Sequence, residues 1–403
     1  MKFKNRVAVA CSTYLMEKTS EPAPEQEEDG SLSTSADVSD VFSAYNCASL
    51  SYGKPHPGDV VESASLRAME LPPATFPLRE SLPEGIVNEG KLSELQLEGV
   101  LYACQRHQQL LPAENGVATR AGFFIGDGAG VGKGRQIAGL ILDSCVRGRR
   151  KHLWFSTSRD LRIDAKRDLR DLGCHAEIMD GCQSLDKSAA KGFGSSSSTA
   201  SSGPPRVLFS TYASLVSGGR RGAAVDDDDG DGGSGGSGGG GSSGGSRAAK
   251  AASKMAATVA AAERAGRRFA TASASGGSGG KRKRKRAISR LEQMVRWCGG
   301  DTFEGCIVFD ECHKAKNLDG GTRVAHDVIA LQAALPRARV LYCSATGVSD
   351  IKHMPFLTRL GLWGGGTAFK NFGQFAHRIG EGGMATMELL SLEMKGIYFS
   401  CHV

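Results

Sequence analysis

The sequence predicts an α/β domain in which helices cover both faces of a parallel sheet. Five short apolar runs, each bounded by polar residues or glycine, have the composition of strands buried on both faces. Stretches with helical spacing lie between these runs, and alternation of strand and helix favours a parallel sheet. The predicted strands are residues 121–125, 152–156, 207–212, 306–309 and 339–343.

The helices are predicted from apolar spacing next to these strands. One amphipathic helix begins at Lys133, directly after the first strand and a glycine-rich loop. A second follows the strand at 152–156, and Gly173 gives it a suitable C-terminal stop. Its apolar residues at helical spacing are Leu161, Ala165, Leu169 and Leu172. We therefore assign residues 91–216 and 287–403 to one domain.

Three segments lack this alternation. Residues 1–40 include an acidic, Ser/Pro-rich stretch with few aliphatic side chains, so we expect a disordered tail. Prolines recur through residues 41–90, which favours an extended segment wrapped on the domain. Residues 217–286 hold an aspartate run, a Gly/Ser tract and an Ala-rich stretch, and we expect a low-complexity insertion looped out of the domain. Within it, residues 248–262 are expected to form at most a transient helix with no surface to pack on.

Composition limits the classes of protein that remain. Glycine makes up 54 of 403 residues, which is consistent with an unfolded portion. The net charge is +7, and the run KRKRKR at 281–286 supplies six of these charges, so the basic balance does not belong to the domain. No apolar stretch reaches the roughly 18 residues of a membrane helix, which excludes an integral membrane protein. The 11 cysteines include no CxxC pair, which disfavours a zinc module or a disulfide framework.

The glycine-rich loop before Lys133 has the build of a phosphate-binding loop. Glycine permits close backbone approach, the N–H groups of the loop can converge on phosphate oxygens, and the helix N-terminus adds partial positive charge. Lys133 is then expected to reach the β and γ phosphates of a nucleotide. Asp127 stands in place of the first glycine of the usual motif, and Gly134 in place of the Ser or Thr that binds Mg²⁺. A simple glycine-rich turn is the alternative.

Asp310 and Glu311 come directly after the buried strand at 306–309. Ligands of open α/β sheets bind at the carboxyl ends of the strands. We expect Asp310 to hold Mg²⁺, directly or through water, and Glu311 to orient and polarise an attacking water. Acidic pairs at strand ends are common, so this pair alone is weak evidence for a site. The glycine-rich loop that precedes it in the sequence strengthens the prediction.

Six runs of the sequence together resemble a known family. They are LSELQLEGVLYACQRH (92–107), GFFIGDGAGVGKGR (122–135), LWFSTSRDLRIDAKRDL (153–169), IVFDECHKAKN (307–317), LPRARVLYCSATG (335–347) and RLGLWGGGTAF (359–369). The loop, the DECH sequence and the later SAT sequence resemble the first RecA-like lobe of a superfamily 2 helicase or translocase. More narrowly, the chain resembles the strawberry notch family of nuclear helicase-like proteins, over roughly residues 41–394 apart from the insertion. The fold implied is a RecA-like P-loop lobe.

The resemblance implies roles for further residues, and the family itself carries both departures in the loop. The implied nucleotide-binding residues are Gln96, which would contact adenine, and Asp127, Gly128, Ala129, Gly130, Val131, Gly132, Lys133, Gly134 and Arg135. The residues that would couple the nucleotide state to nucleic acid are His313, Ser344 and Thr346. Those that would contact a nucleic-acid backbone are Thr157, Ser158, Ser210 and Thr211. A buried structural ring is the alternative for the histidine, and helix capping is the alternative for the hydroxyl residues.

The resemblance also implies ATP and Mg²⁺ as cofactors, DNA or RNA as a partner, a nuclear location and a role in regulating transcription or chromatin. The KRKRKR run is a nuclear localisation signal, a loose nucleic-acid contact or a solvated flank. Superfamily 2 motors hydrolyse ATP between two lobes, and the second lobe supplies an arginine. Because the resemblance fades after Met394, we expect an incomplete motor. A nucleotide-binding nuclear adaptor without turnover is the alternative, and an unrelated P-loop phosphotransferase is a third interpretation.

Overall fold

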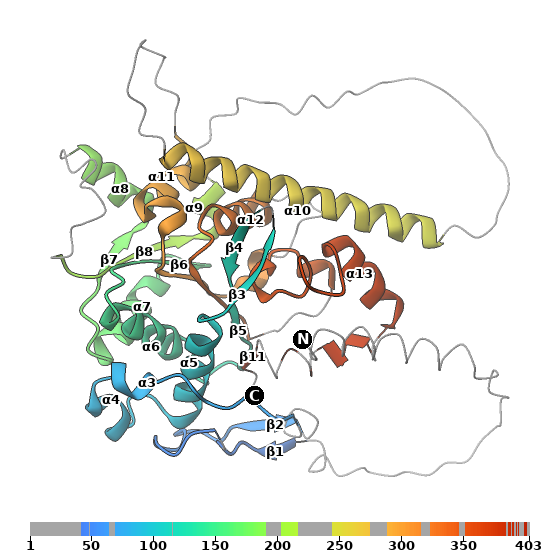
Figure 1. Cartoon of the computed structure of the whole chain (residues 1–403). Coiled ribbons are helices and arrows are strands. Elements are labelled where there is room, and N and C mark those ends of the chain that lie inside the picture. Colours follow the sequence, from blue (N-terminus) through green and yellow to red (C-terminus); the bar gives the residue numbers. More distant parts are fainter. Residues whose placement is uncertain are drawn as a thin grey trace, which may run out of the picture.

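A parallel sheet runs through the centre of the chain (Figure 1). The computed structural model describes residues 42–47, 49–63, 69–114, 116–190, 203–216, 244–274, 288–315, 323–345, 351–383, 386–387, 389–390, 392, 394 and 399–400. The tail predicted over residues 1–40, the KRKRKR run and Thr346 lie outside these residues.

The sheet has seven strands in the order β11-β5-β10-β9-β6-β8-β7, and every neighbouring pair is parallel. The strands are β5 (Phe123–Ile125), β6 (Lys151–Ser156), β7 (Glu177–Asp180), β8 (Arg206–Thr211), β9 (Cys306–Phe309), β10 (Arg339–Cys343) and β11 (Phe399–Ser400). The five predicted strands are therefore confirmed, and β7 and β11 join them at the two edges. In β7 only Met179 is buried, which explains why the sequence carries no clear apolar run there.

Successive residues of the central strands enter two different core clusters, as the period of two requires. Phe155, Phe309 and Tyr342 face one side of the sheet, and their rings stack across neighbouring strands with centroids 5.5 Å and 5.8 Å apart. Trp154 and Val308 face the other side. Both faces are thus apolar and both must be covered.

The face that holds Trp154 is covered by helices from the first half of the chain (Figure 1). These are α3 (Leu78–Ser81), α4 (Glu84–Asn88), α5 (Glu94–Arg106), α6 (Lys133–Val146) and α7 (Leu161–Asp171). Helix α5 begins with a capping box, in which the Ser93 side chain accepts from the Gln96 amide and the Gln96 side chain accepts from the Ser93 amide. Helix α7 ends just before Gly173, whose φ of +72° confirms the predicted stop.

The opposite face is covered by helices from the second half of the chain together with α8 and α9. These are α8 (Gly181–Ala190), α9 (Tyr212–Val216), α10 (Gly244–Ala274), α11 (Arg290–Cys298), α12 (Arg323–Ala334) and α13 (Phe372–Glu381), with 3-10 turns at Gly300–Thr302, Cys312–Ala315, Ile351–His353 and Thr358–Leu360. The predicted arrangement, with helices on both faces of a parallel sheet, is confirmed.

The long helix α10 corrects one expectation about the predicted insertion. It lies along the outside of α12 and reaches α13 (Figure 1), and Met255, Val259 and Ala262 are buried in the same core cluster as the sheet. The expectation that the Ala-rich stretch has no surface to pack on is wrong. Small side chains are what allow this packing, because they let two helix backbones approach closely. A Cβ added at Gly266 would lie only 2.1 Å from the carbonyl oxygen of Ala330 in α12.

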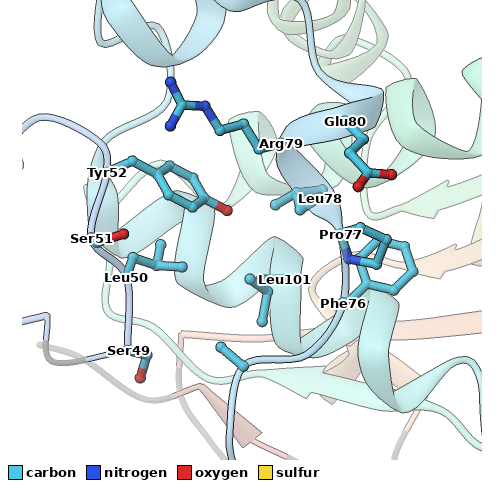
Figure 2. A pocket seen from close by; sticks show the side chains of 11 residues that line it. Ser49, Leu50, Ser51, Tyr52, Phe76, Pro77, Leu78, Arg79, Glu80 and Leu101 are labelled. Atoms are coloured by element: carbon cyan, nitrogen blue, oxygen red, sulfur yellow. The ribbon is translucent and has the colours of Figure 1, made fainter.

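Within residues 41–90 the chain forms short elements that pack on α5. Strands β1 (Phe42–Ala44) and β2 (Val61–Ser63) pair antiparallel, and the Tyr45 hydroxyl donates to Glu98 of α5 at 2.8 Å. A hollow of about 560 Å³ lies between this segment and α3, with Leu101 of α5 on its wall (Figure 2). The Arg79 guanidinium lies 5.5 Å from the centre of the Tyr52 ring. The segment is therefore held to the domain by side-chain contacts.

A second hairpin and a buried arginine complete the described fold. Strands β3 (Leu110–Glu114) and β4 (Val117–Arg120) pair antiparallel between α5 and β5. The buried guanidinium of Arg359 donates to the carbonyl oxygens of Arg120, Leu335 and Pro336 at 3.0, 2.8 and 2.7 Å. Among the described residues, no helix is both long and apolar enough to cross a bilayer.

Candidate functional site

The glycine-rich loop joins the end of β5 to the start of α6. Gly130 and Gly132 have φ of +94° and +84°, in the left-handed region where glycine is favoured. Helix α6 begins at Lys133 directly after Gly132, so its unpaired N–H groups face the loop. The predicted strand, loop and helix are thus present with the geometry of an anion-binding turn.

Lys133 is held inside this loop. Its Nζ donates to the carbonyl oxygens of Asp127 and Gly128, both at 2.9 Å. The side chain is partly buried, and its positive charge is close enough to act on the Asp310 carboxyl. The lysine therefore already lies beside the backbone that is expected to surround a phosphate.

Asp127 is fully buried, and its carboxylate turns toward the core. Its Oδ2 accepts from Gln136 Nε2 of α6 at 2.6 Å. The carboxylate in place of the motif's first glycine thereby ties the loop to the helix that follows. The sequence analysis did not predict Gln136. Its position in the first turn of the predicted helix, close to the loop, was a signal that could have identified it.

Gln96 links α5 to the loop with both ends of its amide. Its Oε1 accepts from the Ser93 backbone at 3.1 Å, and its Nε2 donates to the Val131 carbonyl at 2.9 Å. A Cβ at Gly132 would lie 2.4 Å from this Nε2, which is a second reason for glycine at that position. The expected contact of Gln96 with adenine remains a prediction.

The two residues after Lys133 lie against neighbouring segments. Arg135 donates to the Lys91 carbonyl at 2.9 Å and pairs with Asp171 of α7 at 3.1 Å. At Gly134 an added Cβ would lie 2.3 Å from Oδ2 of Asp168 in α7. A Ser or Thr at 134 would therefore require the Asp168 carboxylate to move aside.

Asp310 follows the last residue of β9 and is held by one side chain from the neighbouring strand β6 and one from the start of α9. Ser156, at the end of β6, donates to its Oδ2 at 2.9 Å, and the Tyr212 hydroxyl donates to its carbonyl oxygen at 2.8 Å. Burial raises the pKa of Asp310 above its ordinary value, and Glu311 adds to the rise, while the Ser156 hydrogen bond and the charge of Lys133 lower it. Ser156 and Tyr212 were not predicted from the sequence, because their contacts depend on strand order.

Glu311 has φ of +50°, and among the described residues it is the one non-glycine with positive φ. Backbone strain of this kind collects at functional sites, where the surrounding structure holds it. The carboxylate is one-third exposed and lies 3.2 Å from Nδ1 of His313. The acidic pair is thus split, with Asp310 turned inward and Glu311 turned toward solvent.

His313 and Ser344 lie together across two strands. His313 Nδ1 is 3.1 Å from Ser344 Oγ, and the Ser344 amide donates to the Ile125 carbonyl at 3.1 Å. Since Ile125 ends β5 and Ser344 follows β10, this contact joins the phosphate loop to the DECH sequence. The coupling role predicted for the pair remains a prediction, and Thr346 lies outside the described residues.

The four hydroxyl residues predicted to contact nucleic acid follow β6 or end β8. Ser158 accepts from the Asp160 amide at 3.2 Å and Thr211 accepts from the Ser214 amide at 3.2 Å, so both hold the backbone at a helix start. Thr157 is exposed, and Ser210 is buried. In the sheet register Ser156 of β6 is opposite Thr211 of β8, which brings these two strand ends together.

The arrangement defines a class of protein. A glycine-rich loop followed by a lysine joins a parallel strand to a helix, and an acidic pair follows a strand of the same sheet. These are the features of P-loop nucleoside triphosphate hydrolases, which bind a nucleotide at this loop.

Comparison with known proteins then gives the family. A family described as "P-loop containing NTP hydrolase pore-1" matches residues 55–227 and 246–402, and the chain belongs to that family. Nearly all of α10 lies within the matched part, whereas most of the Gly/Ser tract does not.

Curated relatives confirm the resemblance to the strawberry notch family. The chain is 38% identical to Protein strawberry notch of Drosophila melanogaster over 93% of its own length and 19% of the relative's. It is 37% identical to Protein strawberry notch homolog 2 of Homo sapiens over 90% of its length and 20% of the relative's. It is 36% identical to Protein FORGETTER 1 of Arabidopsis thaliana over 89% of its length and 22% of the relative's. The chain thus spans about a fifth of the length of these relatives.

One solved structure is similar at low identity. It is the SWI2/SNF2 ATPase core of Sulfolobus solfataricus in complex with double-stranded DNA, with a TM-score of 0.37 and 12% identity over 76% of this chain and 43% of that chain.

Proposed function

We propose that this chain carries the ATP-binding and ATP-hydrolysing lobe of a strawberry-notch-like superfamily 2 ATPase. The observation that supports the proposal is that Lys133, which begins α6 after the loop that follows β5, lies near enough to Asp310, which follows β9 of the same sheet, for its charge to lower the pKa of that carboxyl. Two opposite charges at the carboxyl edge of a parallel sheet suit a phosphate chain with its metal ion.

Each residue of the site has a defined part in binding. The loop N–H groups surround the phosphate oxygens, and Lys133 exchanges its two carbonyl partners for the β and γ phosphates. This exchange is favourable because hydrogen bonds between charged groups are roughly twice as strong as neutral ones. Gln96 keeps the loop attached to α5 while the nucleotide enters.

The residues present fit a magnesium ion. Mg²⁺ is usually bound by one or two carboxylates together with substrate phosphates and several waters, and Asp310 supplies such a carboxylate. Ser156 holds Oδ2 of Asp310, which fixes the direction of the carboxyl group. When bound, the ion neutralises charge that develops on the transferred phosphate. Without a hydroxyl at Gly134, water would fill the position that Ser or Thr takes in the usual motif.

Glu311 is placed to act on the attacking water. Its carboxylate is partly exposed and is turned away from Asp310 by the strained backbone. We assign it the role of accepting a hydrogen bond from the water and removing its proton, as the water oxygen bonds to the γ phosphorus and the bond from that phosphorus to the β,γ-bridging oxygen breaks to release ADP.

We further propose a nucleic-acid strand, DNA or RNA, as the partner of this lobe. Thr157, Ser158, Ser210 and Thr211 would meet its backbone, and His313, Ser344 and Thr346 would couple it to the nucleotide. A nuclear location and a role in regulating transcription or chromatin follow from the resemblance to strawberry notch proteins. The arginine that a second lobe supplies in such motors is proposed to lie outside the described residues.

ATP hydrolysis by the purified chain tests the proposal. Wild type is compared with Glu311→Gln, with and without single-stranded nucleic acid, and Glu381→Gln on the exposed end of α13 is the matched control. We expect nucleic acid to raise turnover in wild type and in the control, and Glu311→Gln to reduce it about 100-fold or more, in the range of a lost general base.

Nucleotide binding is measured in parallel with a fluorescent ATP analogue. Lys133→Ala should weaken binding at least tenfold, since it removes the charge that pairs with the phosphates. Tight binding with no turnover in any variant would instead favour a nucleotide-binding adaptor. Equal binding by wild type and Lys133→Ala would contradict the proposed site.

A further inference from the structure

Basic residues gather at the edge of the sheet formed by the amino ends of its parallel strands. The glycine-rich loop follows the carboxyl end of β5, whereas Lys151, Arg206 and Arg339 are the first residues of β6, β8 and β10. Strands β10, β9, β6 and β8 are neighbours, so these residues form a row with steps of about 4.8 Å per strand. Arg149 and Arg150 directly precede β6 and extend the positive charge.

The charge is concentrated around a single carboxylate. Glu304, just before β9, is approached by three guanidinium groups, those of Arg120 at 3.5 Å, Arg339 at 3.9 Å and Arg337 at 4.0 Å. Arg149 has no such ion pair among the described residues, and its buried Nε has no hydrogen-bond partner there. We call these four arginines the arginine cluster. Four positive charges against one negative leave an excess of three.

The members of the arginine cluster repel one another. Burial, and then the charges of Arg149 and Arg120, lower the pKa of Arg339 to about 10. Burial also lowers the pKa of Arg120. Glu304 opposes that change, and the charges of Arg149 and Arg337 add to it. Because a desolvated charge without a partner is costly, an anion that joins the cluster would stabilise it.

The surroundings of the cluster favour a peptide over a nucleic acid as the source of that anion. Binding of single-stranded nucleic acid draws on aromatic rings that stack on bases, and none of the exposed large apolar side chains in the described part of the chain is aromatic. The ring of Trp297 already has Lys151 Nζ 5.5 Å from its centre. The exposed side chains near the cluster are aliphatic. Leu110, opposite Arg120 in the β3–β4 hairpin, is 58% exposed, and Val146, at the end of α6, is 57% exposed.

We infer that the arginine cluster is a docking surface for an acidic segment of a partner protein, in which aliphatic side chains flank the carboxylates. Carboxylates of the segment pair with Arg149 and with the exposed Arg337, since the planar guanidinium fork matches a carboxylate. Its aliphatic side chains cover Leu110 and Val146. The surface lies at the opposite edge of the sheet from the phosphate loop, so the segment and a nucleotide would not compete.

Fluorescence anisotropy with the full chain and a labelled peptide of glutamates flanked by leucines tests the inference. Arg149→Ala and Arg337→Ala are the variants, and Arg170→Ala, at an exposed position of α7, is the matched control. We expect Arg149→Ala to weaken peptide binding about tenfold, as for one lost hydrogen bond between charged groups. Arg337→Ala, at an exposed pair, should weaken it about twofold, and the control should bind as wild type does.

Two further measurements separate docking from other effects. Arg149→Lys keeps the charge but loses the fork, so its affinity should fall between those of wild type and Arg149→Ala. The same peptide with glutamine in place of each glutamate should bind at least about tenfold more weakly than the acidic peptide. Thermal unfolding of Arg149→Ala should give a melting temperature equal to or above that of wild type, because the substitution removes an unpaired charge.

Wild-type peptide affinity in both Arg149→Ala and Arg337→Ala would overturn the inference, and so would equal binding of the acidic and glutamine peptides. A labelled single-stranded oligonucleotide is measured beside the peptide. If the chain binds the oligonucleotide less tightly in Arg149→Ala and does not bind the peptide, the surface belongs to nucleic acid and the inference is wrong. Binding of the ATP analogue should be the same in every variant.

Discussion

At the scale of single residues, two buried histidines are held in the neutral form by their burial. His107 Nε2 donates to the Val340 carbonyl at 3.0 Å, and its Nδ1 has no partner among the described residues. His152 accepts from the Cys306 amide at 3.2 Å through Nδ1 and contacts the Arg149 carbonyl at 3.1 Å through Nε2. A second proton on either ring would have no acceptor, so protonation requires that the structure open.

These rings make the protein sensitive to acid. Burial lowers the pKa of His107 to about 3 and that of His152 to about 4, against an ordinary value near 6.5. Because the folded pKa lies below the unfolded one, the unfolded chain binds more protons between these values, and the free energy of unfolding falls as pH drops below about 6.5. Each histidine should contribute a slope that rises from about 0.7 kcal/mol per pH unit at pH 6.5 toward about 1.4 kcal/mol per pH unit near pH 5.

Urea unfolding at a series of pH values measures this slope. His152→Gln, whose amide can keep one donor and one acceptor, should lose about half of the histidine contribution between pH 5 and 6.5. His175→Gln, on the exposed turn after α7, is the control and should keep the wild-type slope. An unchanged slope in His152→Gln would show that the buried rings do not govern acid stability.

At the scale of the element, α10 is an integral part of the domain. Its apolar residues recur at spacings of four, three and four residues through Met255, Val259, Ala262 and Gly266, which is one face of a helix. That face packs on α12, and at its other end the Ala252 carbonyl would lie 2.5 Å from a Cβ on Gly373 of α13. Glycine at both contacts allows the helix backbones to touch.

Gly266→Ala tests how closely α10 is packed. In an exposed helix this change stabilises by about 1 kcal/mol through helix propensity. Here the added methyl group would meet the Ala330 carbonyl, so we expect the free energy of unfolding to fall by about 1–3 kcal/mol, the range of an overpacked core. Ala257→Gly, on the exposed side of α10, measures the propensity contribution alone. Stabilisation of Gly266→Ala in urea unfolding would show that α10 does not dock as described.

The same helix shows where sequence patterns are sufficient and where they are not. The strands at 306–309 and 339–343 were predicted to the residue, because a run buried on both faces has an unmistakable composition. For α10 the pattern was present, but alanine and glycine carry little hydrophobic signal. Their contribution here comes from close backbone approach, which depends on the partner helix. The short edge strand β7 was missed because only one of its four side chains is buried.

At the scale of the whole molecule, the two halves of the chain are interleaved in one sheet. Strand β10, from the second half, lies between β5 of the first half and β9 of the second, and β9 in turn pairs with β6 of the first. No surface separates the residues before the predicted insertion from those after it. The aromatic stack of Phe155, Phe309 and Tyr342 crosses the same boundary.

A cut within the Gly/Ser tract should therefore leave one folded unit. We expect a chain with a site-specific protease sequence placed within residues 232–243 to give two fragments that elute together from a sizing column after cleavage and melt in one transition. Separation requires that several parallel strand pairs and both core clusters open, which denaturant can do. Uncleaved protein is the control, and fragments that separate without denaturant would contradict the interleaved sheet.

Part of the candidate site could be predicted from the sequence, because the order of the strands in the sheet determines which strand ends lie together. Lys133, Asp310 and Glu311 follow strands whose ends must meet once the sheet is parallel, so motif and strand order together place them. Ser156 and Tyr212 bond to Asp310 from elements distant in sequence, and nothing in their local sequence distinguishes them. Gln136 bonds to Asp127 from the first turn of α6, and there the position in the helix is the signal.

The lysine of the phosphate loop has a final consequence for binding. The rotamer entropy of a free lysine side chain corresponds to about 2 kcal/mol. Most of it is lost when the ammonium group binds a phosphate. In this chain the carbonyl oxygens of Asp127 and Gly128 already confine Lys133 before any ligand arrives. The entropic penalty is thus met during folding, and a nucleotide encounters a preorganised cation.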